Sequence, residues 1–223
     1  MTTNIEAVIF DLDGLMIESE QFNFDVITRV LEKHGKQVNQ AWFEPTIGMD
    51  NLETAEFLIN ETGLHLTPEE FIEEKHDLML RVLPEVTKPN PGLMDVLQDL
   101  IDAELKMGVA SNSFRVYVRT ALETLGVYES FGCVVSADDV EHTKPAPDIY
   151  LLAAERLGVQ PEKCLALEDS PLGMQAALKA GMACVAIPNP HLKGEDFGGA
   201  TFVFSSLVAF RQNMPRILNN GRL

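Results

Sequence analysis

From residue 93 onward, short apolar runs alternate with amphipathic stretches. The apolar runs predict buried β-strands at 105–110, 132–136, 163–167, 182–187 and 201–204. Between them, apolar residues recur at helical spacing and predict helices at about 93–103, 114–125, 148–157, 172–180 and 206–219. Strands that alternate with helices are typical of a parallel sheet, because each connection must cross one face to reach the next strand. The pattern therefore predicts an α/β fold.

The first predicted strand, Ile5–Phe10, ends directly at two carboxylates that lie one residue apart, Asp11 and Asp13. In an open parallel sheet, ligands bind outside the carboxyl ends of the strands, so these side chains lie where chemistry is expected. Two close carboxylates repel each other unless a cation lies between them, and a divalent cation that prefers oxygen ligands is the usual one. Taken alone, the segment 11–14 is also typical of a turn.

Residues 16–86 follow a different pattern, with helical periodicity throughout and no β-branched run. One helix start is clear at Thr67-Pro68-Glu69-Glu70, with threonine as the cap, proline at the first helical position and acids in the first turn. A break rich in proline and glycine at 88–92 precedes the alternating region. We therefore expect two domains, an α/β core of residues 1–15 and 87–223 and an inserted helical domain of residues 16–86.

Three later predicted strands also end at chemically useful side chains. In chain order these are Ser111 with Asn112, then Lys144, then Glu168 with Asp169. Each group alone has an ordinary explanation as a helix cap, a solvated loop lysine, or acids at a helix amino terminus. Four such groups in order, each after a strand, instead indicate one composite site.

With these four groups in this order, the chain resembles the haloacid dehalogenase superfamily of hydrolases. More narrowly, it is similar to the β-phosphoglucomutase-like phosphatases that carry an inserted helical cap. The resemblance covers the chain from Ile5 to about Leu218. It implies a Rossmann-like parallel-sheet core with a cap formed by the helical insert.

The resemblance also implies a role for each group. Asp11 resembles the nucleophile that attacks phosphorus, and Asp13 resembles the general acid/base, whose backbone carbonyl in the family also contacts the metal. The groups implied to bind the transferring phosphoryl group are Ser111, Asn112 and Lys144, of which Lys144 also stabilises the nucleophile. The implied Mg²⁺ ligands are Asp11, Asp13, Glu168 and Asp169, because hard oxygen donors suit that ion.

The function that follows is a Mg²⁺-dependent phosphomonoesterase with an aspartyl-phosphate intermediate. Its substrate would be a small phosphorylated metabolite, either a sugar phosphate or a nucleoside monophosphate. A haloacid dehalogenase proper would lack the second aspartate and need no metal, and a phosphonatase would use a cap lysine, for which Lys75 is the candidate. A non-catalytic module that binds a phosphorylated ligand is a further alternative, weakened by the presence of both Asp11 and Asp13.

A β-phosphoglucomutase-type phosphomutase is the strongest alternative, because its catalytic residues are the same. Family mutases hold a second phosphate with an arginine in a Gly-x-x-Arg turn of the cap, whereas this chain has Gly48-Met49-Asp50-Asn51. Residues 16–86 also contain 15 acidic and 5 basic side chains. Such a cap is poorly suited to clamp a second phosphate, so a phosphatase is favoured.

Charge and cysteine usage narrow the possible partners. The formal net charge of −17 over 223 residues argues against binding to nucleic acid, which requires clustered Lys and Arg. No apolar run is long enough to span a membrane, and the amino terminus lacks a signal-peptide pattern. The three cysteines, Cys133, Cys164 and Cys184, lie in predicted buried strands and suggest free thiols in a reducing compartment. We therefore expect a cytoplasmic protein, with a monomer as the default state.

Overall fold

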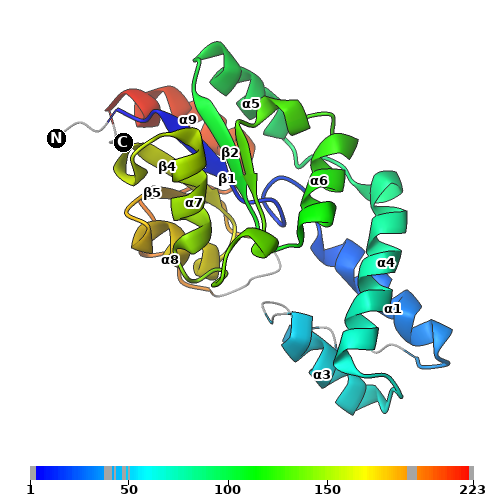
Figure 1. Cartoon of the computed structure of the whole chain (residues 1–223). Coiled ribbons are helices and arrows are strands. Elements are labelled where there is room, and N and C mark those ends of the chain that lie inside the picture. Colours follow the sequence, from blue (N-terminus) through cyan, green and yellow to red (C-terminus); the bar gives the residue numbers. More distant parts are fainter. Residues whose placement is uncertain are drawn as a thin grey trace. The chain divides into compact units, whose positions relative to one another are not determined.

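The core of the protein is a six-stranded sheet in which every pairing is parallel (Figure 1). A computed structural model describes residues 4–37, 42, 44–46, 49, 51–189 and 195–220. The strands are β1 (Ala7–Phe10), β2 (Lys106–Ala110), β3 (Cys133–Val135), β4 (Cys164–Glu168), β5 (Ala183–Ala186) and β6 (Phe202–Val203). The predicted α/β parallel-sheet fold is therefore confirmed, with each predicted strand present and its ends shifted by two residues or fewer.

The order of the strands, β3-β2-β1-β4-β5-β6, places β1 between β2 and β4. The chain therefore leaves β1 toward one edge of the sheet and later crosses back to build the other edge. Strand order reverses at this point, which in open α/β sheets creates a crevice outside the carboxyl ends of the strands. Because the strands are parallel, the residues that follow β1, β2 and β4 lie together at the carboxyl end of the sheet.

Helices cover both faces of the sheet (Figure 1). The core helices are α5 (Leu93–Asp102), α6 (Arg115–Thr124), α7 (Asp148–Leu157), α8 (Pro171–Lys179) and α9 (Leu207–Asn220). Single turns of 3₁₀ helix occur at η2 (Tyr128–Ser130), η3 (Ala137–Asp139) and η4 (Pro161–Lys163). The helix α7 packs against α8 and against the first three strands, whereas α5 packs against α9.

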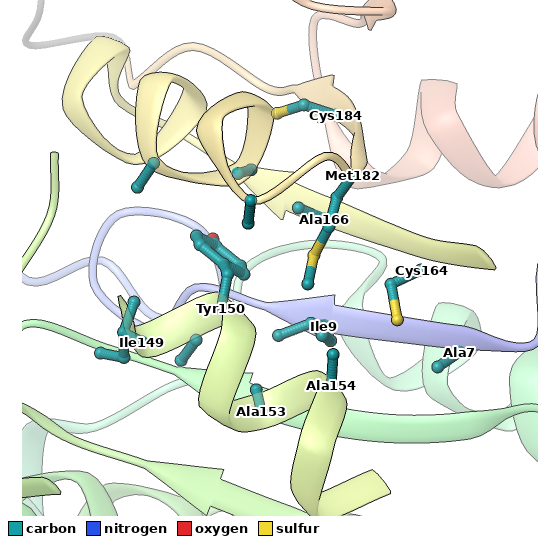
Figure 2. Packing of buried hydrophobic residues seen from close by; sticks show 14 of the residues in the cluster. Ala7, Ile9, Ile149, Tyr150, Ala153, Ala154, Cys164, Ala166, Met182 and Cys184 are labelled. Atoms are coloured by element: carbon teal, nitrogen blue, oxygen red, sulfur yellow. The ribbon is translucent and has the colours of Figure 1, made fainter. Parts of the chain in front are cut away.

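The contact between α7 and the sheet buries small and aliphatic side chains. Figure 2 shows Tyr150 and Ala154 of α7 facing the sheet residues Ile9 and Ala166, all of which are fully or almost fully buried. Alanines at the interface let the helix approach the sheet closely, which strengthens dispersion contacts. This packing fixes the position of Tyr150, the largest side chain in the interface.

In a second compact unit, residues 19–86, the regular secondary structure of the described part is all helical. It contains α1 (Glu20–Lys33), the 3₁₀ turn η1 (Glu44–Thr46), α3 (Asn51–Thr62) and α4 (Pro68–Val86). The predicted start of α4 is confirmed: the Glu70 backbone N–H donates to Thr67 Oγ1 and the Thr67 N–H donates to the Glu70 carboxylate. The other unit comprises Met1–Glu18 and Thr87–Leu223.

All three cysteines are buried and unpaired, as predicted. Burial raises the pKa of Cys133 and of Cys164 to about 11, so both remain protonated thiols at neutral pH. Among the helices described, none combines the length and the apolar character needed to cross a membrane.

Candidate active site

Asp11 follows the central strand directly and is held in the sheet by its backbone. Its N–H donates to the carbonyl of Leu167 on β4 at 3.0 Å, which continues the ladder between β1 and β4 by one residue. The side chain is buried, with 7% of the residue exposed. The sheet therefore sets the position of this carboxylate rigidly.

Lys144 connects two of the carboxylates. Its Nζ donates to Asp11 Oδ1 at 2.5 Å and to Glu168 Oε1 at 2.6 Å, with almost no exposure of the three side chains. Burial by itself would lower the pKa of Lys144, but the charges of Asp11 and Glu168 outweigh it and the pKa is raised above its usual range. The lysine is thus a permanent positive charge at this edge of the sheet.

The Asn112 side chain holds the backbone of Lys144. Its Oδ1 accepts from the Lys144 N–H at 2.9 Å, and its Nδ2 donates to the Lys144 carbonyl at 3.2 Å. The amide therefore anchors the loop that presents the lysine. One N–H of the amide remains for another acceptor, because a primary amide has two.

Glu168 is completely buried at the end of β4. Its Oε1 accepts from Tyr150 OH at 2.5 Å as well as from Lys144 Nζ, and the lysine nitrogen lies 5.1 Å from the centre of the Tyr150 ring. Glycine at position 173 leaves room for this carboxylate, since a β-carbon there would lie 2.0 Å from its atoms. The pair of donors compensates for the cost of burying the charge.

Three buried acids form a cluster that could hold a metal ion. Asp11, Glu168 and Asp169 each place a carboxylate oxygen within 4.8 Å of the others. The pKa of Asp11 is raised to about 7, because burial together with the charges of Glu168 and Asp13 outweighs the attraction of Lys144. Burial and the charges of Asp11 and Glu168 also raise the pKa of Asp169 well above its usual range.

One lysine carries a single positive charge and cannot neutralise three buried carboxylates. A hard divalent cation that prefers oxygen ligands would supply the missing charge, so the donor set fits Mg²⁺.

A second layer of contacts holds Asp169. Asn189 Nδ2 donates to Asp169 Oδ2 at 3.0 Å, and the Asn189 backbone N–H donates to the Asp169 carbonyl at 3.1 Å.

The loop after β1 passes close to Asp169 at Gly14, whose φ of +79° is in the left-handed region. Asn90 secures that loop by donating from Nδ2 to the carbonyls of Gly14 and Leu15, each at 2.9 Å.

The carboxylate of Asp13 has its own set of partners. Tyr117 OH donates to Oδ1 at 2.8 Å and Ser113 Oγ donates to Oδ2 at 2.7 Å, with Ser111 Oγ at 3.5 Å from the same oxygen. Ser111 is itself oriented by accepting from the Ser113 N–H at 3.1 Å. The two aspartates of the first loop thus lie in different surroundings.

The structure brings most of the side chains predicted from the sequence together. Lys144 contacts both Asp11 and Glu168, and Asp169 lies beside these two carboxylates. Ser111 lies 3.5 Å from the carboxylate of Asp13. Sequence reasoning missed four partners, namely Tyr150, Tyr117, Asn189 and Asn90. The two tyrosines occupy inward-facing positions of helices, where an aromatic residue is usually read as core. No local pattern marked them, because helical spacing does not link Tyr117 to Ser113, which precedes the extended N-cap residue Phe114.

Comparison with known proteins gives consistent matches. The sequence profile of the family described as haloacid dehalogenase-like hydrolase matches residues 8–187. YhcW of Bacillus subtilis (strain 168) is 38% identical over 186 residues, 83% of this chain and 84% of that protein. The phosphorylated carbohydrates phosphatase of Thermotoga maritima is 33% identical over 178 residues, 80% of this chain and 82% of that protein. A crystal structure of CbbY from Rhodobacter sphaeroides in complex with phosphate gives a TM-score of 0.84 at 25% identity, covering 92% of this chain and 96% of that one.

Proposed function

This chain belongs to the haloacid dehalogenase-like hydrolase family, and on that basis we propose that it is a Mg²⁺-dependent phosphomonoesterase. Its substrate is a small phosphorylated metabolite, a sugar phosphate or a nucleoside monophosphate. The main support is the contact of one buried lysine with Asp11 and Glu168, beside a third buried acid, Asp169. This arrangement places a nucleophile, a fixed cation and ligands for a metal together at the carboxyl end of the sheet.

Asp11 acts as the nucleophile in this proposal. A carboxylate oxygen forms a bond to phosphorus while the bond from phosphorus to the leaving alcohol breaks, which gives an aspartyl-phosphate. Lys144 holds the attacking carboxylate by its hydrogen bond and stabilises negative charge on the phosphoryl oxygens. Ser111 and Asn112 bind the same phosphoryl group with a hydroxyl and an amide N–H.

The metal ligands are drawn from the acidic cluster. Asp11, Glu168 and Asp169 would hold Mg²⁺, together with the backbone carbonyl of Asp13, as the family resemblance implies. When bound, the ion supplies positive charge that reduces the repulsion between a carboxylate and a phosphate dianion. Hydrogen bonds fix the orientation of two of these ligands: Asn189 donates to Asp169 and Tyr150 donates to Glu168.

Asp13 transfers the protons. Its carboxyl group protonates the oxygen of the leaving alcohol in the first step, and the resulting carboxylate takes a proton from water in the second. The activated water attacks phosphorus, the bond to Asp11 breaks, and phosphate is released. The helical unit, residues 19–86, acts as the cap that selects the leaving group.

Hydrolysis of p-nitrophenyl phosphate with and without Mg²⁺ tests this function. Wild-type protein should release nitrophenol only with the metal, and Asp11→Asn should lower the rate by at least about a thousandfold. Asp102→Asn is the matched control, because Asp102 is an exposed acid of α5 bonded to Gln98. Acid quenching of a reaction with labelled substrate should trap a phosphoryl group on Asp11.

Three results would contradict the proposal. Near-normal turnover by folded Asp11→Asn would exclude Asp11 as the nucleophile. Full activity in EDTA, with the metal content verified as nil, would exclude the role of Mg²⁺. Tight binding of phosphorylated metabolites without turnover of any of them would instead indicate a non-catalytic binding module.

A further inference from the structure

We propose that Tyr117 and Ser113 are positioning residues that hold the carboxyl group of Asp13 in place for proton transfer to the leaving group. This inference rests on the proposed phosphatase function and adds to it a specific dependence on the substrate. Tyr117 OH lies 2.8 Å from Oδ1 of Asp13 and Ser113 Oγ lies 2.7 Å from Oδ2. Each carboxyl oxygen therefore has its own hydroxyl partner, and rotation of the group would break at least one contact.

The two hydroxyls belong to rigid parts of the core. Tyr117 lies in the first turn of α6 and is only 1% exposed. Its ring packs against that of Phe114, with 5.7 Å between the centroids. The Ser113 carbonyl accepts from the Ala137 N–H at 3.1 Å, which ties the segment after β2 to the segment after β3. Both donors are thus held by packing or by backbone bonds that do not depend on Asp13.

The chemistry of hydroxyl groups suits a residue that must exchange a proton. A hydroxyl can donate to a carboxylate and can accept from a protonated carboxyl, because it carries both a proton and lone pairs. Tyr117 and Ser113 can therefore keep a hydrogen bond to Asp13 in either state by turning their O–H groups. A lysine or arginine in the same place could only donate and would favour the ionised form alone.

The surroundings of the two aspartates support this division of labour. Asp11 is bonded to the ammonium of Lys144, which favours the ionised form that a nucleophile needs. Asp13 contacts hydroxyls, including the more distant Ser111 Oγ at 3.5 Å. The structure thus gives the nucleophile a cationic partner and the proton donor neutral partners.

A positioning role predicts an effect that grows with the basicity of the leaving group. In the first step, the bond between phosphorus and the leaving oxygen breaks as that oxygen takes the proton from Asp13. Nitrophenolate is stable as an anion near neutral pH and needs little help, whereas phenolate and alkoxides need the proton. Misplacement of Asp13 should therefore slow poor leaving groups selectively.

The test compares Tyr117→Phe with wild type on p-nitrophenyl phosphate and phenyl phosphate, measuring kcat/KM, which reports the first irreversible step. We expect kcat/KM for phenyl phosphate to fall about tenfold to a hundredfold, the range for a lost hydrogen bond to a charged group, here the carboxylate that Asp13 becomes as its proton leaves. The value for p-nitrophenyl phosphate should fall less than about threefold. Tyr128→Phe is the matched control, since it removes a tyrosine hydroxyl beyond the other end of α6.

Ser113→Ala is the second variant and should show the same selective loss, so the inference stays testable if Tyr117→Phe does not fold. Equal losses on both substrates in the folded variants would overturn the positioning role, as would faster turnover of phenyl phosphate. A wild-type protein that hydrolyses neither substrate would instead contradict the proposed function itself. Circular dichroism and thermal unfolding of each variant establish that the comparison is between folded proteins.

Discussion

A β-carbon added to Gly14 would lie 1.8 Å from Oδ2 of Asp169, far inside the closest approach of any side chain. The loop that follows the first strand therefore runs directly against a carboxylate of the acidic cluster. The φ of Gly14, +79°, is also one that other residues rarely adopt. Glycine is required here for space first and for conformation second.

We expect Gly14→Ala to displace Asp169 and to weaken Mg²⁺ binding by about tenfold to a hundredfold, as loss of a supporting contact typically does. Gly181→Ala is the matched control, because Gly181 has a φ of +83° and nothing within 4 Å of the added carbon. Both variants carry the left-handed cost of about 1–2 kcal/mol. Titration calorimetry with Mg²⁺ decides: equal affinity in the two variants would show that the collision at Asp169 is harmless.

Asp11 should make the stability of the metal-free protein depend on pH. Its pKa is raised to about 7 in the folded protein from 3.8 in the unfolded chain. The folded state therefore binds more protons between these values, and stability falls as pH rises from about 4 to 7.

In the presence of chelator, the free energy of unfolding of the wild type should fall as pH rises through that window. Relative to Asp11→Asn, the fall should be up to about 1.4 kcal/mol per pH unit. Urea unfolding of both proteins between pH 4 and pH 8 measures the difference. A difference that stays constant with pH would show that Asp11 is not desolvated as the structure indicates.

Asp139 should make the stability of the protein depend on pH in the opposite sense to Asp11. Burial raises its pKa, but hydrogen bonds from Ser136 and Arg156 outweigh this and lower it to about 2. The contribution is present above the unfolded value of 3.8 and is lost as pH falls toward 2. Asp139→Asn should therefore lose about 1–2 kcal/mol at pH 7.

The same variant should lose almost no stability near pH 2. Thermal unfolding at both pH values measures the effect, with the exposed neighbour Asp138→Asn as the control. Equal losses at the two pH values would mean that the hydrogen bonds do not depend on the charge of Asp139.

β-Glucose 1-phosphate should yield inorganic phosphate rather than glucose 6-phosphate. A mutase must grip a second phosphate, and losing an arginine–phosphate contact typically costs about 2–5 kcal/mol. This chain has Asn51 in the place of that arginine, and Asn51 Oδ1 accepts from the buried Nζ of Lys75 at 3.0 Å.

A coupled assay with glucose-6-phosphate dehydrogenase and catalytic glucose 1,6-bisphosphate measures the two products together. Glucose 6-phosphate formation that outpaces phosphate release would show a mutase. If Lys75→Met then abolished it, Lys75 would be the group that holds the second phosphate.

Local patterns in the sequence were sufficient to predict the strands and the groups at their ends. The alternation of apolar runs and helical periodicity located β1, β2 and β4, because burial on both faces of a parallel sheet demands continuous apolar residues. The start of α4 followed in the same way from Thr67, Pro68 and the acids after them, since helix-start signals lie within one turn of the chain. Asp11, Lys144 and Glu168 were identified because each follows a predicted strand.

Only the tertiary structure decided which atoms meet. Lys144 and Asp11 are 133 residues apart, and Tyr117 and Asp13 are 104 apart, so no local rule links either pair. The order of the strands brings these segments together at the carboxyl end of the sheet. The packing of α6 and α7 then determines which tyrosine contacts which carboxylate. The candidate catalytic side chains could be identified because they interrupt an apolar pattern, whereas the tyrosines that contact them could not, because in the sequence they continue that pattern.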